Sequence, residues 1–176
     1  MRRAALLALA ALPLALAACP LPQPLAEVAR TDGGVSTPII LPETAVPTET
    51  TVFVRTNCNP PQFTLTATVS DLDTDEFVEA RWFLDWNPNT PTLLADTAVP
   101  ASGDPNDPLR PIPPLVFQPQ ATAPQHVVEV VVSNNFLATS DGTQPFQRAA
   151  PPPFQTHSYL WVFQFVGPTD SRGRCQ

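Results

Sequence analysis

The clearest pattern in this chain is Phe63-Thr64-Leu65-Thr66-Ala67-Thr68-Val69-Ser70, in which apolar and hydroxyl side chains alternate without a break. Residues 78–86 repeat the pattern, with Val78, Ala80 and Trp82 among the apolar positions. Successive side chains of a strand point to opposite faces of a sheet, so a period of two is typical of a half-buried strand. The two stretches therefore predict neighbouring strands, joined by the acidic turn 71–77.

Five weaker strand signals surround this pair, and no window of useful length shows the 3.6-residue period of a helix. The expected strands are 51–56, 63–70, 78–86, 92–99, 115–118, 127–133 and 158–166. Residues 100–114, with their Gly-Asp-Pro-Asn-Asp-Pro core, are expected to form a loop. Some seven short strands separated by turn residues predict an all-β antiparallel sandwich.

The segments 66–71 and 78–85 resemble immunoglobulin-like modules of bacterial surface proteins, including the polycystic-kidney-disease-type repeat. The resemblance covers residues 51–166. It implies that the acidic turn joins two core strands and that Trp82 packs between the two sheets. The expected strands 63–70 and 127–133 carry no cysteine, so the inter-sheet disulfide of antibody domains is not expected.

The N-terminus predicts export. Arg2 and Arg3 precede an apolar run of about 15 residues, which is shorter than the roughly 20 residues that span a bilayer. The run ends in Leu16-Ala17-Ala18-Cys19, which resembles the lipobox of bacterial lipoproteins. The resemblance implies that residues 1–18 are a signal peptide and that Cys19, the first mature residue, carries diacylglycerol and an acylated amine. A plain secretory signal is the alternative.

The rest of the chain divides into a tether and a domain. Residues 19–50 are rich in proline, threonine and alanine and show no apolar periodicity, so they predict a disordered tether. Residues 51–176 then form the sandwich. Pro20, rather than aspartate, follows Cys19, and in enterobacterial lipoproteins aspartate at that place retains the protein at the inner membrane. The resemblance therefore implies a bacterial cell envelope protein at the outer membrane.

The charge of the chain argues against two kinds of partner. The formal net charge is −7, the chain has no lysine, and 24 residues are proline. An acidic chain of this kind is a poor partner for nucleic acid or anionic lipid headgroups. The expected membrane contact is therefore the lipid on Cys19 alone.

Lipidation of Cys19 leaves Cys58 and Cys175, an even number in an exported protein. A disulfide between them is expected in an oxidising compartment, and two free thiols are the alternative. Immunoglobulin-like sandwiches often have the first strand parallel to the last. This resemblance implies that Cys58 and Cys175 meet at the same end of the domain.

The acidic turn holds the sharpest cluster of potential ligands. Asp71, Asp73 and Asp75 occupy alternate positions and offer the hard oxygen ligands that calcium prefers. The cluster lacks the glycine and the final glutamate of an EF-hand loop. The alternative is a solvated turn, in which aspartate is common for conformational reasons.

No catalytic pattern stands out. The two histidines, His126 and His157, precede late strands and are expected at opposite ends of an antiparallel pair. A nucleophile elbow, a zinc-protease motif and a glycine-rich phosphate loop are all missing from the sequence. Trp86, at the end of its expected strand, is the candidate for stacking on a sugar, although a buried aromatic core is the commoner outcome.

These observations predict a non-enzymatic, membrane-anchored envelope lipoprotein that needs no cofactor. Its β-sandwich is expected to serve a structural or protein-interaction role, with an unknown envelope protein as partner. The alternative is a ligand-binding module for calcium or glycan at the cell surface. An enzyme without a recognisable motif is a third class.

Overall fold

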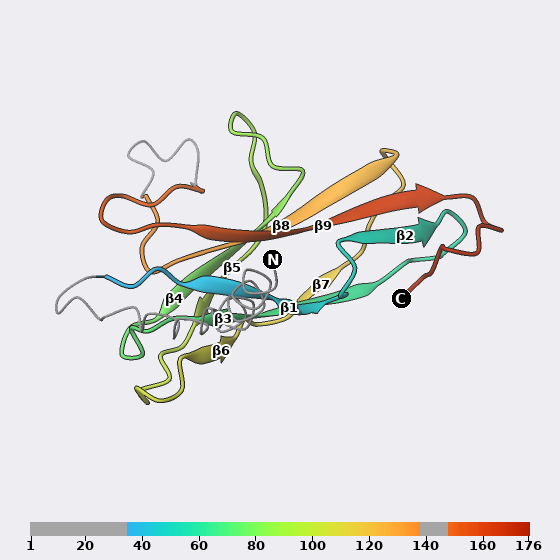
Figure 1. Cartoon of the computed structure of the whole chain (residues 1–176). Coiled ribbons are helices and arrows are strands. Elements are labelled where there is room, and N and C mark those ends of the chain that lie inside the picture. The colour runs from blue at the N-terminus through green and yellow to red at the C-terminus, as the bar shows by residue number, and fades with distance from the viewer. Residues whose placement is uncertain (1–34, 138–147) are drawn as a thin grey trace, which may run out of the picture. The chain divides into compact units, whose positions relative to one another are not determined.

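Nine β-strands and no helix make up the described part of the computed structural model, residues 35–137 and 148–176 (Figure 1). The strands are β1 (Ile39–Val46), β2 (Thr51–Arg55), β3 (Phe63–Ser70), β4 (Val78–Leu84), β5 (Thr92–Val99), β6 (Leu109–Pro111), β7 (Leu115–Phe117), β8 (Gln125–Ser133) and β9 (His157–Val166). The all-β prediction is confirmed. Each of the seven expected strands is present, with bounds that differ by at most two residues.

The strands form two sheets. In the smaller sheet, β3 pairs antiparallel with β1, β6 and β7. The five-stranded sheet has the order β2-β9-β8-β4-β5, and its pairs are antiparallel except for β2 and β9. The β3–β4 turn and β6 lie at one end of the sandwich, and the ends of β2 and β9 lie at the other (Figure 1). We call these the acidic-turn end and the disulfide end.

The core lies between the sheets and is aromatic at its centre. Trp82 and Trp161 are fully buried and stack with ring centroids 5.8 Å apart. Phe163 packs edge-on against Phe117 at 4.9 Å. The predicted position of Trp82 between the sheets is confirmed, and Val128, Val130 and Val132 face the same core. The alternation read from the sequence therefore selects the inward face correctly.

The sandwich begins earlier in the chain than the sequence predicted. β1 lies within residues 19–50, which were assigned to the disordered tether, and its Ile40 and Ala45 are fully buried. The pairing of β1 with β3 shifts register between Leu41 and Val46, where Thr44 Oγ1 accepts a hydrogen bond from Thr68 N at 2.8 Å. Because of this irregularity, the sequence of β1 does not alternate between buried and exposed residues and gives no strand signal. The prediction of a tether up to residue 50 is wrong, because β1 belongs to the sandwich.

The parallel pairing of β2 and β9 confirms the predicted arrangement of the first expected strand and the last. Thr51 lies opposite Val162 and Arg55 opposite Val166. Beyond these strands, Cys58 and Cys175 form a disulfide with Cα atoms 5.5 Å apart. The tail is also held by its backbone, because Arg174 N donates to Phe53 O at 2.9 Å. The C-terminal tail is therefore pinned along β2.

Replacing both bridge cysteines, Cys58→Ser with Cys175→Ser, should lower the free energy of unfolding. The bridge joins residues separated by 117 positions, and for a loop of this size chain entropy gives an upper value of about 4–5 kcal/mol. Urea unfolding of the oxidised protein and the double variant measures the difference. Equal midpoints would show that the bridge contributes no stability.

Candidate functional sites at the two ends of the sandwich

At the acidic-turn end, a buried ion pair joins the β3–β4 turn to β6. Arg110 Nη2 lies 2.6 Å from Asp71 Oδ2, and both side chains are almost completely buried. Arg110 Nη1 donates to Glu76 O at 2.6 Å, and Asn134 Nδ2 donates to Asp71 Oδ2 at 2.9 Å. Two segments, β6 and the residues that follow β8, are thus tied to the Asp71 carboxylate.

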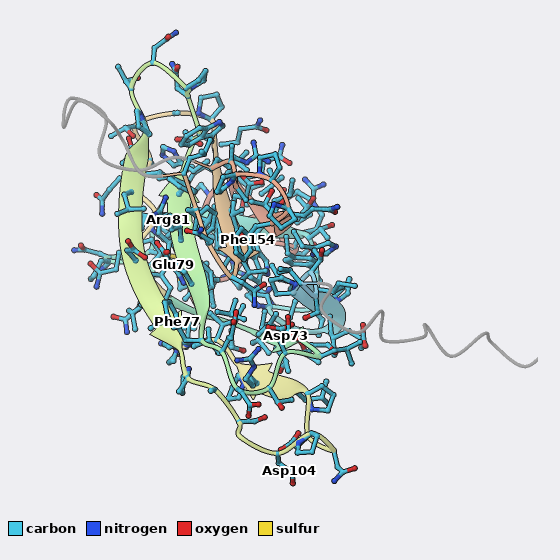
Figure 2. The ribbon with its side chains drawn as sticks, turned by 90° about the vertical axis from the view of Figure 1, so that its left-hand side faces the viewer. Asp73, Phe77, Glu79, Arg81, Asp104 and Phe154 are labelled. Atoms are coloured by element: carbon cyan, nitrogen blue, oxygen red, sulfur yellow. A yellow bond between two sulfur atoms is a disulfide. The ribbon has the colours of Figure 1, made fainter. Side chains whose placement is uncertain are left out.

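The same turn grips the chain where it enters the sandwich. Ser36 Oγ donates to Asp71 Oδ1, and Ser36 N donates to Asp73 Oδ2 at 2.8 Å. Asp73 N in turn donates to Ser36 Oγ at 3.1 Å. Figure 2 views this end, with Asp73 on the turn and Asp104 on the loop between β5 and β6. The acidic turn therefore fixes the point at which the N-terminal segment joins the domain.

These contacts bear directly on the calcium hypothesis. Asp71 and Asp73 lie together but are directed at Ser36 and Arg110, while Asp75 is on the exposed part of the turn. Within residues 35–137 and 148–176, no group of three or more histidine, cysteine, aspartate or glutamate side chains is arranged to hold a metal ion. The structural alternative, a turn held by hydrogen bonds, accounts for the contacts of Asp71 and Asp73.

At the disulfide end, a groove of about 820 Å³ opens between two links and the C-terminal tail. Its walls are the link from β1 to β2, the link from β2 to β3 and the C-terminal tail. The lining residues are Val46, Pro47, Thr48, Glu49, Asn59, Pro60, Gln62, Phe63, Thr64, Arg174, Cys175 and Gln176. The volume lies in the range of small-ligand sites, about 300–1,000 Å³.

One ion pair stands at the rim of this groove. Arg174 Nη2 lies 3.0 Å from Glu49 Oε2, and both side chains are well exposed. Backbone hydrogen bonding and Arg174 together hold the pKa of Glu49 below its usual range. The pair offers a carboxylate and a guanidinium to a ligand, beside the amide, hydroxyl and apolar side chains that form the rest of the lining.

The middle of the outer face of the five-stranded sheet is covered by apolar side chains. Phe83, Val131 and Phe136 form a second buried apolar cluster there. Arg81 lies on this face beside Glu79, with its guanidinium 4.2 Å from the Phe136 ring centroid (Figure 2). The segment that follows β8 thus shields the middle of the sheet from solvent.

A buried carboxylate on the same face has an unusual pKa. Glu129 is almost fully buried, and Arg148 Nη2 donates to its Oε1 at 2.5 Å. Burial raises the pKa of Glu129 above its ordinary value, although the Arg148 charge acts in the opposite direction. The cost of removing the carboxylate from water therefore exceeds the gain from its ion pair.

Trp86 does not continue the alternation of β4. The strand ends at Leu84, and Asp85 adopts a left-handed backbone with φ 46°, which aspartate tolerates better than most residues. Trp86 is half-buried, and its ring packs edge-on against Phe83 at 4.7 Å. The indole proposed for sugar stacking therefore belongs to the apolar cluster on the outer face.

The two histidines lie at opposite ends of the β8–β9 pair, as predicted. In this antiparallel register His126 is opposite Phe163, and His157 is opposite Val132. His126 Nδ1 lies 2.6 Å from Asp85 Oδ2, and its Nε2 lies 2.7 Å from Gln120 O. His157 Nδ1 accepts a hydrogen bond from Ile40 N at 3.2 Å. Each ring joins separate segments of the fold.

Cys19 lies outside the described residues. Residues 35–137 and 148–176 contain no helix that is long and apolar enough to cross a membrane. No protein-family model and no curated protein matches the chain.

Sequence reasoning missed Ser36, Arg110 and the groove at the disulfide end. One signal was present for Arg110, because it is the only cationic residue between Arg81 and Arg148. The groove gave no signal, since its walls come from residues 46–64 and 174–176, which meet only in the folded chain.

The Arg110→Met substitution should destabilise the protein strongly because it leaves the Asp71 charge buried without its partner. Breaking such a pair costs about 3–5 kcal/mol, whereas Asp71→Asn combined with Arg110→Met should recover part of the loss. Arg172→Met is the control, since the ion pair of Arg172 with Asp170 is solvent-screened and should contribute little to stability. Urea unfolding that ranks Arg110→Met equal to Arg172→Met would contradict the role of the buried pair.

Glu129 should make the protein more stable in mild acid. Because its pKa is raised in the folded state, this stabilising contribution is complete below the ordinary value of 4.5 and is lost as the pH rises through the raised pKa. Glu129→Gln should remove this pH dependence, and Glu43→Gln at an exposed position of β1 is the control. Thermal unfolding measured across this pH range checks it. Parallel curves for wild type and Glu129→Gln would refute the assignment.

Proposed function

We propose that this chain is an exported, lipid-anchored protein of the bacterial cell envelope, attached through Cys19 and delivered to the outer membrane. In this proposal, the β-sandwich has a non-enzymatic role, structural or in binding another envelope protein. The observation that carries the proposal is the Cys58–Cys175 disulfide, because such bonds persist in oxidising compartments outside the cytosol. It agrees with the export signal and lipobox pattern of residues 1–19.

The entry point of the chain supports the same reading. The described fold starts at Val35, and Ser36 is held by Asp71 and Asp73. Within the described residues, Ser36 is the first residue after the proposed lipid anchor at Cys19 that the acidic turn holds by hydrogen bonds. In the proposed arrangement, these hydrogen bonds keep a pull on the N-terminal segment from peeling β1 away from the sandwich.

Cys19→Ala should abolish incorporation of labelled palmitate, since this thiol is the proposed acylation site, and should release the protein from membranes or block its maturation. Metabolic labelling followed by membrane fractionation measures both effects. The pair Cys58→Ser and Cys175→Ser is the matched control and should remain labelled. Equal labelling of wild type and Cys19→Ala would refute the lipid anchor.

A further inference from the structure

The groove at the disulfide end lies beside a part of β3 that β1 does not reach. β1 ends at Val46, opposite Thr66, and the chain then crosses to the other sheet to begin β2 at Thr51. Trp161 Nε1 donates to Pro47 O at 2.9 Å and ties the crossing segment to the five-stranded sheet. Thr64 therefore lies beyond the end of β1, and it lines the groove.

The direction of the Thr64 backbone groups follows from the register of β3. Alternate residues of a strand direct their N–H and C=O groups to opposite neighbours. Ala67 O accepts from Ile112 N on the β6 side, whereas Thr68 N donates to Thr44 Oγ1 on the β1 side. Even-numbered residues of β3 thus face the β1 side, so Thr64 presents its N–H and C=O to the groove.

The C-terminal tail closes the end of the groove that lies away from β1. Gln62 faces the same side as Thr64, and its N–H donates to Cys175 O at 3.1 Å. The groove therefore runs from the end of β1 at Val46 to the pinned tail at Cys175, with Thr64 between them. Its length suits a short peptide segment, and the wall formed by the tail depends on the disulfide.

We infer that this groove binds a short extended peptide segment of a partner protein. The peptide pairs with Thr64 of β3, in the position beside β3 that lies beyond the end of β1. Strand addition of this kind takes its affinity from main-chain hydrogen bonds and its specificity from the surrounding side chains. The half-exposed Val46 offers an apolar contact, and Asn59 offers an exposed amide. The Glu49–Arg174 pair at the rim can bind a charged residue of either sign.

This inference deepens the interaction role proposed above by naming the surface and the kind of partner. It rests on that proposal only for the assumption that a partner exists. The test uses the full mature protein and measures peptide binding, so failure of the lipid anchor at Cys19 and failure of the groove give different results.

The probe is a library of random short peptides displayed on phage and selected on the purified mature protein, from which a selected peptide is synthesised. Thr64→Pro removes the N–H that faces the groove and spares the pairing with β7, and proline is tolerated where that side of a strand is free. It should weaken binding about tenfold, since one main-chain hydrogen bond is lost. Thr64→Val keeps the backbone and should bind as wild type does.

Hydrogen exchange of single amides in the wild-type protein gives a second measurement, which does not depend on the folding of Thr64→Pro. Bound peptide should slow exchange of the Thr64 amide about tenfold or more, while the Leu65 amide, which faces β7, should be protected with or without peptide. The double variant Cys58→Ser and Cys175→Ser should lose binding with the tail. The inference is overturned if no peptide is selected above background, or if binding leaves Thr64 exchange unchanged and perturbs only Glu49 and Arg174.

Discussion

β2 and β9 run side by side in the same direction, and much of the molecule depends on this pairing. It places Cys58 and Cys175 at one end, where they can bond. Because β1 pairs with β3 and β2 pairs with β9, the chain must also cross from the smaller sheet to the five-stranded sheet between β1 and β2. The groove at the disulfide end is the space left by that crossing, and the tail held along β2 forms its third wall. One parallel pair thus creates both the covalent bridge and the candidate binding surface.

Polar groups are buried at one end of the sandwich and exposed at the other. At the acidic-turn end, Asp71 is buried, and its oxygens are taken by Ser36, Arg110 and Asn134. Such a network is expensive to remove from water, and its strict geometry favours one arrangement of the segments that it joins. At the disulfide end, the polar groups of the groove are largely exposed. The first end is built to hold the chain together, and the second leaves backbone and side-chain groups open to a ligand.

The fold could be predicted wherever a strand has one regular buried face. β3 matches its predicted bounds because its buried face alternates along the whole strand without interruption. β1 could not be found, because its buried residues Ile40 and Ala45 are five positions apart and straddle a register shift. β6 has only three residues and ends in Pro111, so it carries no periodic signal. The acidic turn was recognised as a special cluster, but its partner Arg110 lies 39 residues away, and only the tertiary fold brings the two together.

The position of the disulfide also governs how the domain responds to mechanical load. It closes residues 58–175 into a covalent ring, and of the nine strands in the described residues this ring contains seven and leaves β1 and β2 outside. A pull between the N-terminal segment and a partner held at the tail passes through the sulfur–sulfur bond and bypasses everything within the ring. Only the stretch from Ser36 to Cys58 can then be drawn out, roughly 20 residues or on the order of 70 Å. The domain would yield by one short, fixed extension and then bear the load through covalent bonds.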